Sequence, residues 1–348
     1  MSTPTTAPSP QVQEHGGGDA KAGRRLRQVR EVGILLALVL LIVVTTVVNP
    51  NFLSAQSLRD LLLGATLLTI LAVGQTLVIV TRSVDLSVGS ILGLTAFAVG
   101  SLFIAFPNLP IPVVAVAGVL IGAVCGAVNG ALVAAARVPA LVVTLGTLYV
   151  FRGVDHWLAG GRQINAADMP GPFLALGRAT VLGIPVLALV AVVVVAAVGW
   201  YLSSYRSGRE LYAIGSEPAA ARLSGISVDR RIFAAFVANG ALAGLAGVLY
   251  AARFGTLDAT VGTGLELQVV AAAVVGGVAI FGGSGTVLGA ALGAVLLTTI
   301  GSALPILRVD GFWQQAVVGL LILIAIGMDR LLAVRAERRL RGGESRGA

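Results

Sequence analysis

Long stretches without a charged side chain dominate this sequence of 348 residues. Residues 32–48, 111–136 and 181–202 contain no charge at all. Roughly 20 apolar helical residues cross a hydrocarbon core of about 30 Å, and helix is the expected state because lipid cannot satisfy an open backbone. Only 11% of the residues are charged, against roughly 25% in a soluble domain. We therefore predict an all-α polytopic membrane protein.

About ten transmembrane helices are predicted when every such stretch is marked. Valine is frequent in them, but the runs are too long and alternate too little to be strands of a membrane barrel. The first run lacks a small-residue cleavage site, so we expect it to be retained as an anchor. The predicted spans are residues 32–48, 58–81, 88–106, 111–136, 140–158, 180–202, 231–252, 265–282, 286–304 and 312–328.

Basic residues are distributed unevenly around these spans. If the N-terminus lies inside, eighteen of the 24 Lys and Arg residues fall on the cytoplasmic side, where positive charge accumulates. We therefore expect a multi-pass membrane protein with both termini in the cytoplasm. The net charge of +8 is explained by contact with anionic membrane lipid and requires no nucleic acid. The six outer residues are Arg59, Arg152, Arg162, Arg178, Arg253 and Arg308.

Three parts are expected along the chain. Residues 1–31 form a basic cytoplasmic tail, predicted to be disordered because its first 23 residues are rich in Ser, Thr, Pro and Gly. Residues 32–330 form the transmembrane domain, and residues 331–348 form a second basic cytoplasmic tail. One cysteine and two histidines in the whole sequence predict neither an intramolecular disulfide nor a metal site built from these residues.

A polar interruption, the sequence TRSVDLS at residues 81–87, separates two predicted spans. Charges at membrane depth are costly, so they pair, face a cavity or lie at the interface. In one interpretation the interruption is a short cytoplasmic turn in which Asp85 caps the next helix. In the other it is a broken helix whose backbone lines a solute path together with Gln75, Thr81 and Ser87. Both interpretations place it near the cytoplasmic mouth.

A second region, residues 262–289, is rich in glycine. Its glycines are expected to let helices pack closely, although they could also free backbone groups for a polar solute. Glu266 begins a predicted span, where it could complement the helix dipole, pair with Arg253 or contact an external partner. Residues 74–93 and 262–289 share one pattern, in which a glycine-rich apolar stretch is followed by a polar break and a second apolar stretch. This similarity hints at an internal repeat.

The source of energy for any transport must lie outside this chain. A P-loop requires a lysine against phosphate, and Lys21 in the tail is the only lysine. The sequence GGSGT at residues 282–286 is therefore not a nucleotide site, and the chain is predicted to be no ATPase by itself. Ion-coupled carriers usually hold charged relays at mid-span, whereas the charges here lie near span ends. This pattern favours a passive pore half driven by another protein over an ion-coupled carrier or a membrane scaffold.

One polar segment, residues 203–231, carries eight charges in 29 residues on the predicted cytoplasmic side. Within it, ELYAIG is expected to be extended or turn-like, and Ser216 to cap a short helix. Pro218 suits the first turn of such a helix, and Gly225 suits a left-handed stop after it. A short helix with an alanine face, oriented by Glu217 and Arg222, would fit a groove on a partner protein. We call residues 203–231 the coupling segment.

Four motifs in order carry a family resemblance. They are TRSVDLSVGS, NGALVAAARVPALVVTLGTLYVFRG, GRELYAIGSEPAAARLSGI and VVGGVAIFGGSGTVLGA, within residues 32–330. The chain resembles permeases of bacterial monosaccharide ABC importers of the ribose, xylose and rhamnose type. The resemblance implies that this chain binds no cofactor and that ATP is used by a partner ATPase with tandem nucleotide-binding domains. It also implies two further partners, an external sugar-binding protein and a second permease subunit. The coupling pattern falls on Gly208, Arg209, Glu210, Gly215, Glu217, Ala220, Ala221, Arg222 and Gly225.

The interruption at residues 81–87 departs from the sugar permeases that carry Gly-Gly-Ile before Asp-Leu-Ser. Here Arg82, Ser83 and Val84 precede Asp85, a form that resembles importers of rhamnose and of a sugar-like autoinducer. Arg82 is expected to face inner-leaflet phosphates. Alternating access between two permease subunits would carry the sugar past hydroxyls, amides and backbone groups. The candidate path residues are Gln75, Thr81, Asp85, Ser87, Asn129, Thr144 and Glu266.

Overall fold

The computed structural model describes residues 16–310, 312, 313, 315–317, 319–321, 323, 324 and 327, with side chains from residue 31 onward. Most of the predicted span 312–328 and the tail 331–348 lie outside these residues. The first helix, α1, spans Gly16–Val48 and so includes part of the stretch predicted as a tail. No proline interrupts residues 16–31, so the helix of the first apolar span can continue back into this stretch.

Seven of the described helices are long and apolar enough to cross a membrane. This confirms a helical, polytopic membrane protein. Of the ten predicted spans, the one at 140–158 corresponds to a helix outside these seven, and the one at 265–282 is helical only in its first part. The seven are α1 (Gly16–Val48), α2 (Ala55–Ile79), α3 (Val88–Ala105), α4 (Ile111–Ala134), α7 (Val186–Ser204), α10 (Val228–Phe254) and α12 (Val287–Ile306).

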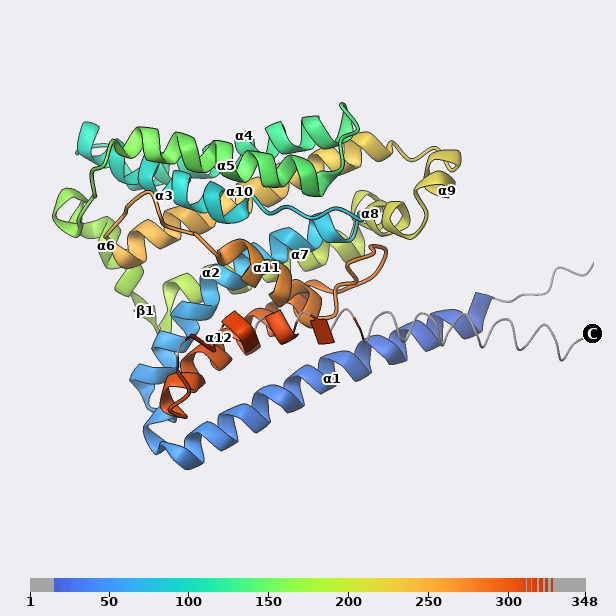
Figure 1. Ribbon diagram of the computed structural model, residues 1–348, viewed down its shortest axis with the longest axis horizontal. Coiled ribbons are helices and arrows are strands. Elements are labelled where there is room, and N and C mark those ends of the chain that lie inside the picture. The colour runs from blue at the N-terminus through green and yellow to red at the C-terminus, as the bar shows by residue number, and fades with distance from the viewer. Residues whose placement is uncertain are drawn as a thin grey trace, which may run out of the picture.

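The remaining elements are short or lie between these spans. Figure 1 shows α8 and α9 at one end of the bundle, together with the N-terminal end of α1, and α6 and β1 at the other end. These elements are η1 (Pro50–Leu53), α5 (Ala140–Ala159), η2 (Ala166–Asp168), α6 (Gly171–Arg178), β1 (Thr180–Val181), β2 (Ile184–Pro185), α8 (Arg206–Ser216), α9 (Pro218–Leu223) and α11 (Leu265–Val275).

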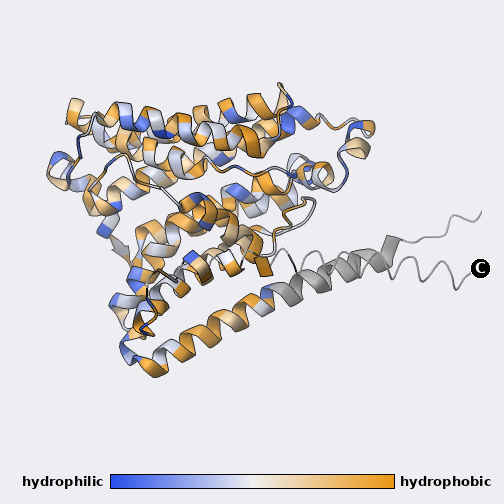
Figure 2. Ribbon diagram, viewed as in Figure 1, coloured by the Kyte–Doolittle hydropathy of each residue, from blue (hydrophilic) through white to orange (hydrophobic). Residues whose placement is uncertain are grey.

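Lipid-facing surface is evident on several helices. Leu36, Leu40 and Val47 on α1 are 64%, 65% and 79% exposed, and Figure 2 shows α1 as hydrophobic along almost its whole coloured length. Large exposed aliphatic side chains also cover faces of α4, α5 and α7. A contiguous apolar surface of this extent would aggregate in water, so the bundle is built for a bilayer.

Helices α4 and α10 form the closest pair in the bundle. A Cβ added at Gly122 would collide with the Gly240 carbonyl oxygen, and one added at Gly240 would collide with the Gly122 carbonyl oxygen. Gly126 and Gly244 continue the same contact. In lipid, where packing drives helix association, small residues at such a seam let two backbones touch.

Two predicted spans are corrected at their ends. The span 180–202 begins with a hairpin, in which Thr180 pairs with Pro185 and Val181 with Ile184, because Leu182 and Gly183 take positive φ angles of 52° and 82°. Helix α7 therefore starts only at Val186.

The span 265–282 ends early, since α11 stops at Val275. Residues 276–286 are irregular, and Gly277, Gly282 and Gly283 have φ angles of 89°, 82° and 74°. Close packing of this glycine-rich region is confirmed, because a Cβ at Gly276 would collide with the Gly289 carbonyl on α12.

Both polar breaks have the same form, with a helix, an irregular stretch and a second helix. They separate α2 from α3 and α11 from α12, and they touch, because Gly283 N donates to Val80 O at 3.0 Å.

Candidate functional site

The break between α2 and α3 lies inside the bundle. Thr81, Asp85 and Ser87 are all buried, and the Thr81 hydroxyl donates to Val78 O at 2.7 Å where α2 ends. A solvent-exposed turn would not bury these groups. Residues 81–87 are therefore a buried break between two helices and not a solvent-exposed turn.

Asp85 is the centre of the polar groups in this break. Its Oδ1 accepts from the Ser87 amide at 2.9 Å and from the Ser87 hydroxyl at 2.7 Å. Its Oδ2 accepts from Asn239 Nδ2 on α10 at 3.0 Å. The bond to the Ser87 amide is the one expected of a helix cap, but the carboxylate also joins α3 to α10. Since Asp85 is 0% exposed, these donors are what make its burial tolerable.

Two amides and a hydroxyl complete the arrangement. Asn129 Nδ2 on α4 donates to the Ser87 hydroxyl at 2.8 Å. With the Gln75 amide assigned so that its nitrogen faces Asp85 O, it donates to that carbonyl at 3.2 Å and its oxygen accepts from Asp85 N at 3.0 Å. Thr144 Oγ1 on α5 donates to Val84 O at 3.2 Å. We call Gln75, Asp85, Ser87, Asn129 and Asn239 the polar cluster.

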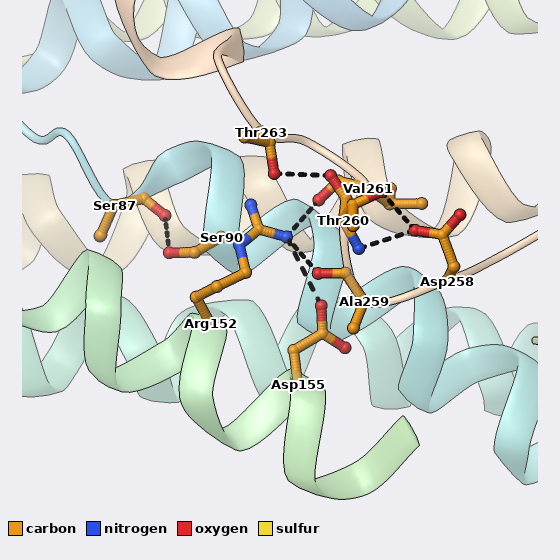
Figure 3. A network of polar contacts seen from close by, with 9 residues as sticks. All are labelled: Ser87, Ser90, Arg152, Asp155, Asp258, Ala259, Thr260, Val261 and Thr263. Carbon is orange, nitrogen blue, oxygen red and sulfur yellow. Dashed lines mark hydrogen bonds and ion pairs between the residues drawn. The ribbon is translucent and has the colours of Figure 1, made fainter. Parts of the chain in front are cut away.

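A second polar network lies along α3, on the side facing α5 (Figure 3). Residues 255–264, the connecting segment, join α10 to α11 and run beside α3. A Cβ at Gly100 would meet Leu257, whereas one at Gly89 would collide with Gly262 O. Arg152 Nη1 on α5 donates to Ala259 O at 3.0 Å and to Val261 O at 2.6 Å. Arg152 thus satisfies two carbonyls of an irregular stretch whose own backbone bonds form only turns, such as Val261 N to Asp258 O.

Acidic residues surround this network. Asp155 Oδ2 lies 3.7 Å from Arg152 Nη1, and neither of its buried carboxylate oxygens has a hydrogen-bond partner among the described residues. Asp258 accepts from the Thr260 side chain and amide, and these hydrogen bonds hold the pKa of Asp258 below its usual range. The connecting segment therefore carries a fixed negative charge.

Glu266 lies in this network and not in the polar cluster. Its Oε1 accepts from Gly264 N at 3.2 Å, as suits a carboxylate in the first turn of α11. The considered pairing with Arg253 is not formed, because Arg253 Nη1 donates to Leu63 O at 2.5 Å.

The coupling segment folds differently from the prediction in its first half. ELYAIG is helical and belongs to α8, so the prediction of an extended stretch was wrong. Leu211 and Ile214 are buried three residues apart, which gives α8 an apolar face to pack. Ser216 ends α8 and is not the cap of the next helix, whose N-cap position is Glu217.

The predicted stop signals of the second half are confirmed. Helix α9 begins at Pro218 and ends at Leu223, and Gly225 follows with a φ of 76°. Exposure divides the nine predicted coupling residues into two groups. Gly208, Glu210, Gly215 and Ala221 are buried and hold the segment to the bundle, whereas Arg209, Glu217, Ala220, Arg222 and Gly225 are exposed.

Comparison with known proteins decides which family this architecture belongs to. Residues 57–326 match the family described as the permease component of the branched-chain amino acid transport system. The chain belongs to this permease family. It is 40% identical over 312 residues to the autoinducer 2 import system permease protein LsrC of Shigella flexneri, covering 90% of each chain.

Other relatives of the permease carry the same name. The LsrC protein of Escherichia coli K12 is 39% identical over 312 residues and 90% of each chain. That of Klebsiella pneumoniae is 39% identical over 318 residues and 91% of each chain. No solved structure matches. The resemblance to sugar ABC permeases is confirmed, and the permease is a multi-pass protein of the inner membrane that forms the transport subunit of an importer.

Sequence reasoning missed Asn239. The permease buries this residue to 1% exposure and aims it at Asp85. Asn239 could have been found from the sequence, because it lies inside the predicted span 231–252, where a polar side chain needs a hydrogen-bond partner. Of the predicted path residues, Gln75, Asp85, Ser87 and Asn129 come together, Thr144 reaches the same break, Thr81 lies at its start and Glu266 lies apart.

Glu210 ties the coupling segment to α10. It accepts from Arg231 Nε at 2.6 Å and from Arg206 Nε at 2.9 Å. Burial raises the pKa of Glu210, but hydrogen bonds from the two arginines outweigh this and hold its pKa below the ordinary value. A carboxyl with a lowered folded-state pKa stabilises the fold above its unfolded pKa, and loses that contribution as the pH falls through the folded value.

We expect Glu210→Gln to lower the free energy of unfolding of the purified permease at pH 7 by about 1 kcal/mol. The effect is small because the Arg206 side chain is exposed, so solvent screens its attraction to Glu210. The difference from wild type should shrink as the pH falls below the ordinary pKa of glutamate, about 4.3, and vanish once Glu210 is protonated in the folded state as well. Thermal unfolding in detergent from pH 3 to 8 measures both effects. Glu217→Gln, an exposed change in the same segment, is the control. An equal difference at all pH values would contradict the assignment.

Proposed function

We propose that the permease is the membrane half of an ATP-driven importer for a small neutral sugar-like solute. A separate ATPase with tandem nucleotide-binding domains engages the coupling segment, and an external binding protein delivers the solute. Two permease subunits form the path. Each crosses the membrane about ten times and keeps both termini in the cytoplasm.

The observation that carries this proposal is the isolation of α9 at one end of the bundle (Figure 1). Leu223 in its last turn is 91% exposed, and Glu217 and Arg222 are exposed beside it. We take the exposed surface of α9, with Leu223 and the charges of Glu217 and Arg222, as the surface that the ATPase contacts. The N-terminal end of α1 lies at the same end, which supports a cytoplasmic position for both.

The solute class is proposed from the polar cluster and the relatives. Asn129 Oδ1 is buried without a hydrogen-bond partner among the described residues, and an unpaired amide oxygen beside the Ser87 hydroxyl suits the hydroxyl group of a neutral polyol. The relatives named for autoinducer 2 import make that molecule the first solute to test. The ion-coupled alternative is disfavoured because Asp85 is fully engaged by neutral donors.

The test is the double variant Glu217→Lys, Leu223→Glu, produced with the partner ATPase. Both side chains are exposed, so the fold should survive. We expect recovery of the co-purifying ATPase and uptake of labelled autoinducer 2 each to fall at least about tenfold, since losing an anchor costs roughly 2 kcal/mol or more. Leu182→Glu, which changes a 98% exposed leucine at the other end, should keep the ATPase.

Two results would count against the proposal. Wild-type recovery of the ATPase by the double variant would mean that α9 is not its docking helix. Uptake into vesicles without any ATPase, abolished by an ionophore, would identify an ion-coupled carrier.

A further inference from the structure

Arg82 connects the coupling segment to the break in the membrane domain. Its Nε donates to Gly215 O at 2.5 Å, and its Nη2 donates to Ser216 O. The guanidinium therefore binds the protein and is not directed only at lipid phosphates, as the sequence led us to expect. Arg82 also has a φ of 65°, a left-handed conformation that is uncommon for residues other than glycine.

The two carbonyls that Arg82 binds are the last ones of α8. Carbonyls at a helix C-terminus have no partner within the helix, and the helix dipole places partial negative charge there. A planar guanidinium with several donors matches such a pair. Because α9 begins two residues after Ser216, the Arg82 side chain holds the junction between α8 and α9.

Three segments meet tightly around this junction. A Cβ at Gly215 would collide with Val80 O, and one at Gly282 would lie 2.5 Å from Arg82 Cγ. The Tyr212 hydroxyl donates to Gly285 O at 3.1 Å. The ends of α2 and α8 and the second break are thus packed against one another, so the α8–α9 junction cannot shift without pushing on Arg82.

The other end of the same short stretch belongs to the polar cluster. Asp85 follows Arg82 by three residues and is held by Ser87 and Asn239, while Val84 O accepts from Thr144. Residues 82–87 are therefore fixed at one end to the α8–α9 junction and at the other to α4, α5 and α10. Because this stretch is short and held at both ends, a displacement of one end should displace the other end as well.

We propose that Arg82 is the positioning residue that passes movement of α8 and α9 to the polar cluster. The inference rests on the proposed function, which supplies the movement through the ATPase. Binding of ATP by that partner displaces α9, the carbonyls of Gly215 and Ser216 draw Arg82 with them, and Asp85 shifts relative to Asn129 and Asn239.

Cys125 provides a reporter inside the chain. It is the only cysteine of the sequence, it is 6% exposed, and it lies one turn before Asn129 on α4. A change at the polar cluster should alter its accessibility. The experiment measures the rate at which N-ethylmaleimide modifies Cys125 in the complex with the ATPase, with and without ATP and vanadate, and reads the permease chain separately by mass spectrometry.

Arg82→Gly removes the link and leaves the backbone in a conformation that glycine prefers. Arg137→Gly is the matched control, because Arg137 is also exposed and has a φ of 56°. We expect wild type and Arg137→Gly to change their labelling rate at least about fivefold with nucleotide, the lower range of allosteric coupling. Arg82→Gly should change less than about twofold with the ATPase still bound, and Arg82→Lys should recover part of the response.

Each other outcome overturns the proposal in a recognisable way. A wild-type response in Arg82→Gly would mean that movement reaches the cluster by another route, while the proposed function stands. Loss of the ATPase from Arg82→Gly alone would make Arg82 a docking residue and not a transmitting one. No nucleotide response in wild type with the ATPase bound would mean that movement of α9 does not reach the polar cluster, which overturns the link, whereas the proposed function fails only if ATPase recovery and uptake fail their own test.

Discussion

Asp85→Ala should destabilise the permease by about 3 kcal/mol or more, because it leaves buried donors of Ser87 and Asn239 without an acceptor. Each unsatisfied buried group costs about 1–3 kcal/mol, and this carboxylate accepts from four donor groups, of which the Asn129 amide is the most distant at 3.5 Å. Thermal unfolding in detergent measures the loss, and uptake into vesicles should fall with it.

The controls for this prediction use the partners of Asp85. Asp60→Ala removes an exposed carboxylate that accepts only from Gln56 in the described residues, and surface changes of this kind usually stay within about 0.5 kcal/mol. Asn239→Leu combined with Asp85→Ala should cost less than the sum of the two single changes, since they share one bond. Strict additivity would show that the contact between them contributes nothing.

Gly122→Leu should separate α4 from α10 and cost about 3 kcal/mol. Any side chain at Gly122 would collide with the Gly240 carbonyl and the Gly244 backbone, and a backbone cannot move aside as a flexible side chain can. The fraction of permease that remains monodisperse after heating in detergent measures the effect.

Gly153→Leu is the matched control on α5. No atom lies within 4 Å of a Cβ added there, and the residue faces outward. It should leave the heated fraction unchanged. Equal losses from the two variants would mean that the leucine side chain itself, and not the α4–α10 seam, causes the damage.

Features fixed by local chemistry could be predicted from the sequence. The uncharged runs predicted the membrane helices, and Pro218 and Gly225 predicted the ends of α9. Asp85 and Ser87 lie in the polar interruption, and Gln75 and Asn129 are amides inside apolar spans, so these four members of the cluster could be selected from the sequence.

Features that depend on packing between distant residues could not be predicted from the sequence. ELYAIG has no strong local preference, and α8 forms because Leu211 and Ile214 are buried and Glu210 finds two arginines. Helix α11 ends early because Gly276 and Gly277 follow Val275. From the sequence alone, these glycines could equally have been part of a helix surface that packs against a neighbour. The contacts of the Arg82 side chain were predicted wrongly, because nothing in the sequence indicates that residues 82 and 215 lie next to each other.

The connecting segment has a consequence for how the chain is made. Residues 255–264 lie along α3 as irregular backbone. Their backbone partners include Arg152 on α5, which donates to Ala259 O and Val261 O, and Ile164, whose amide donates to Leu257 O. All of these partners precede the segment in the sequence, so we expect it to take up this conformation only after α3 and α5 are in place.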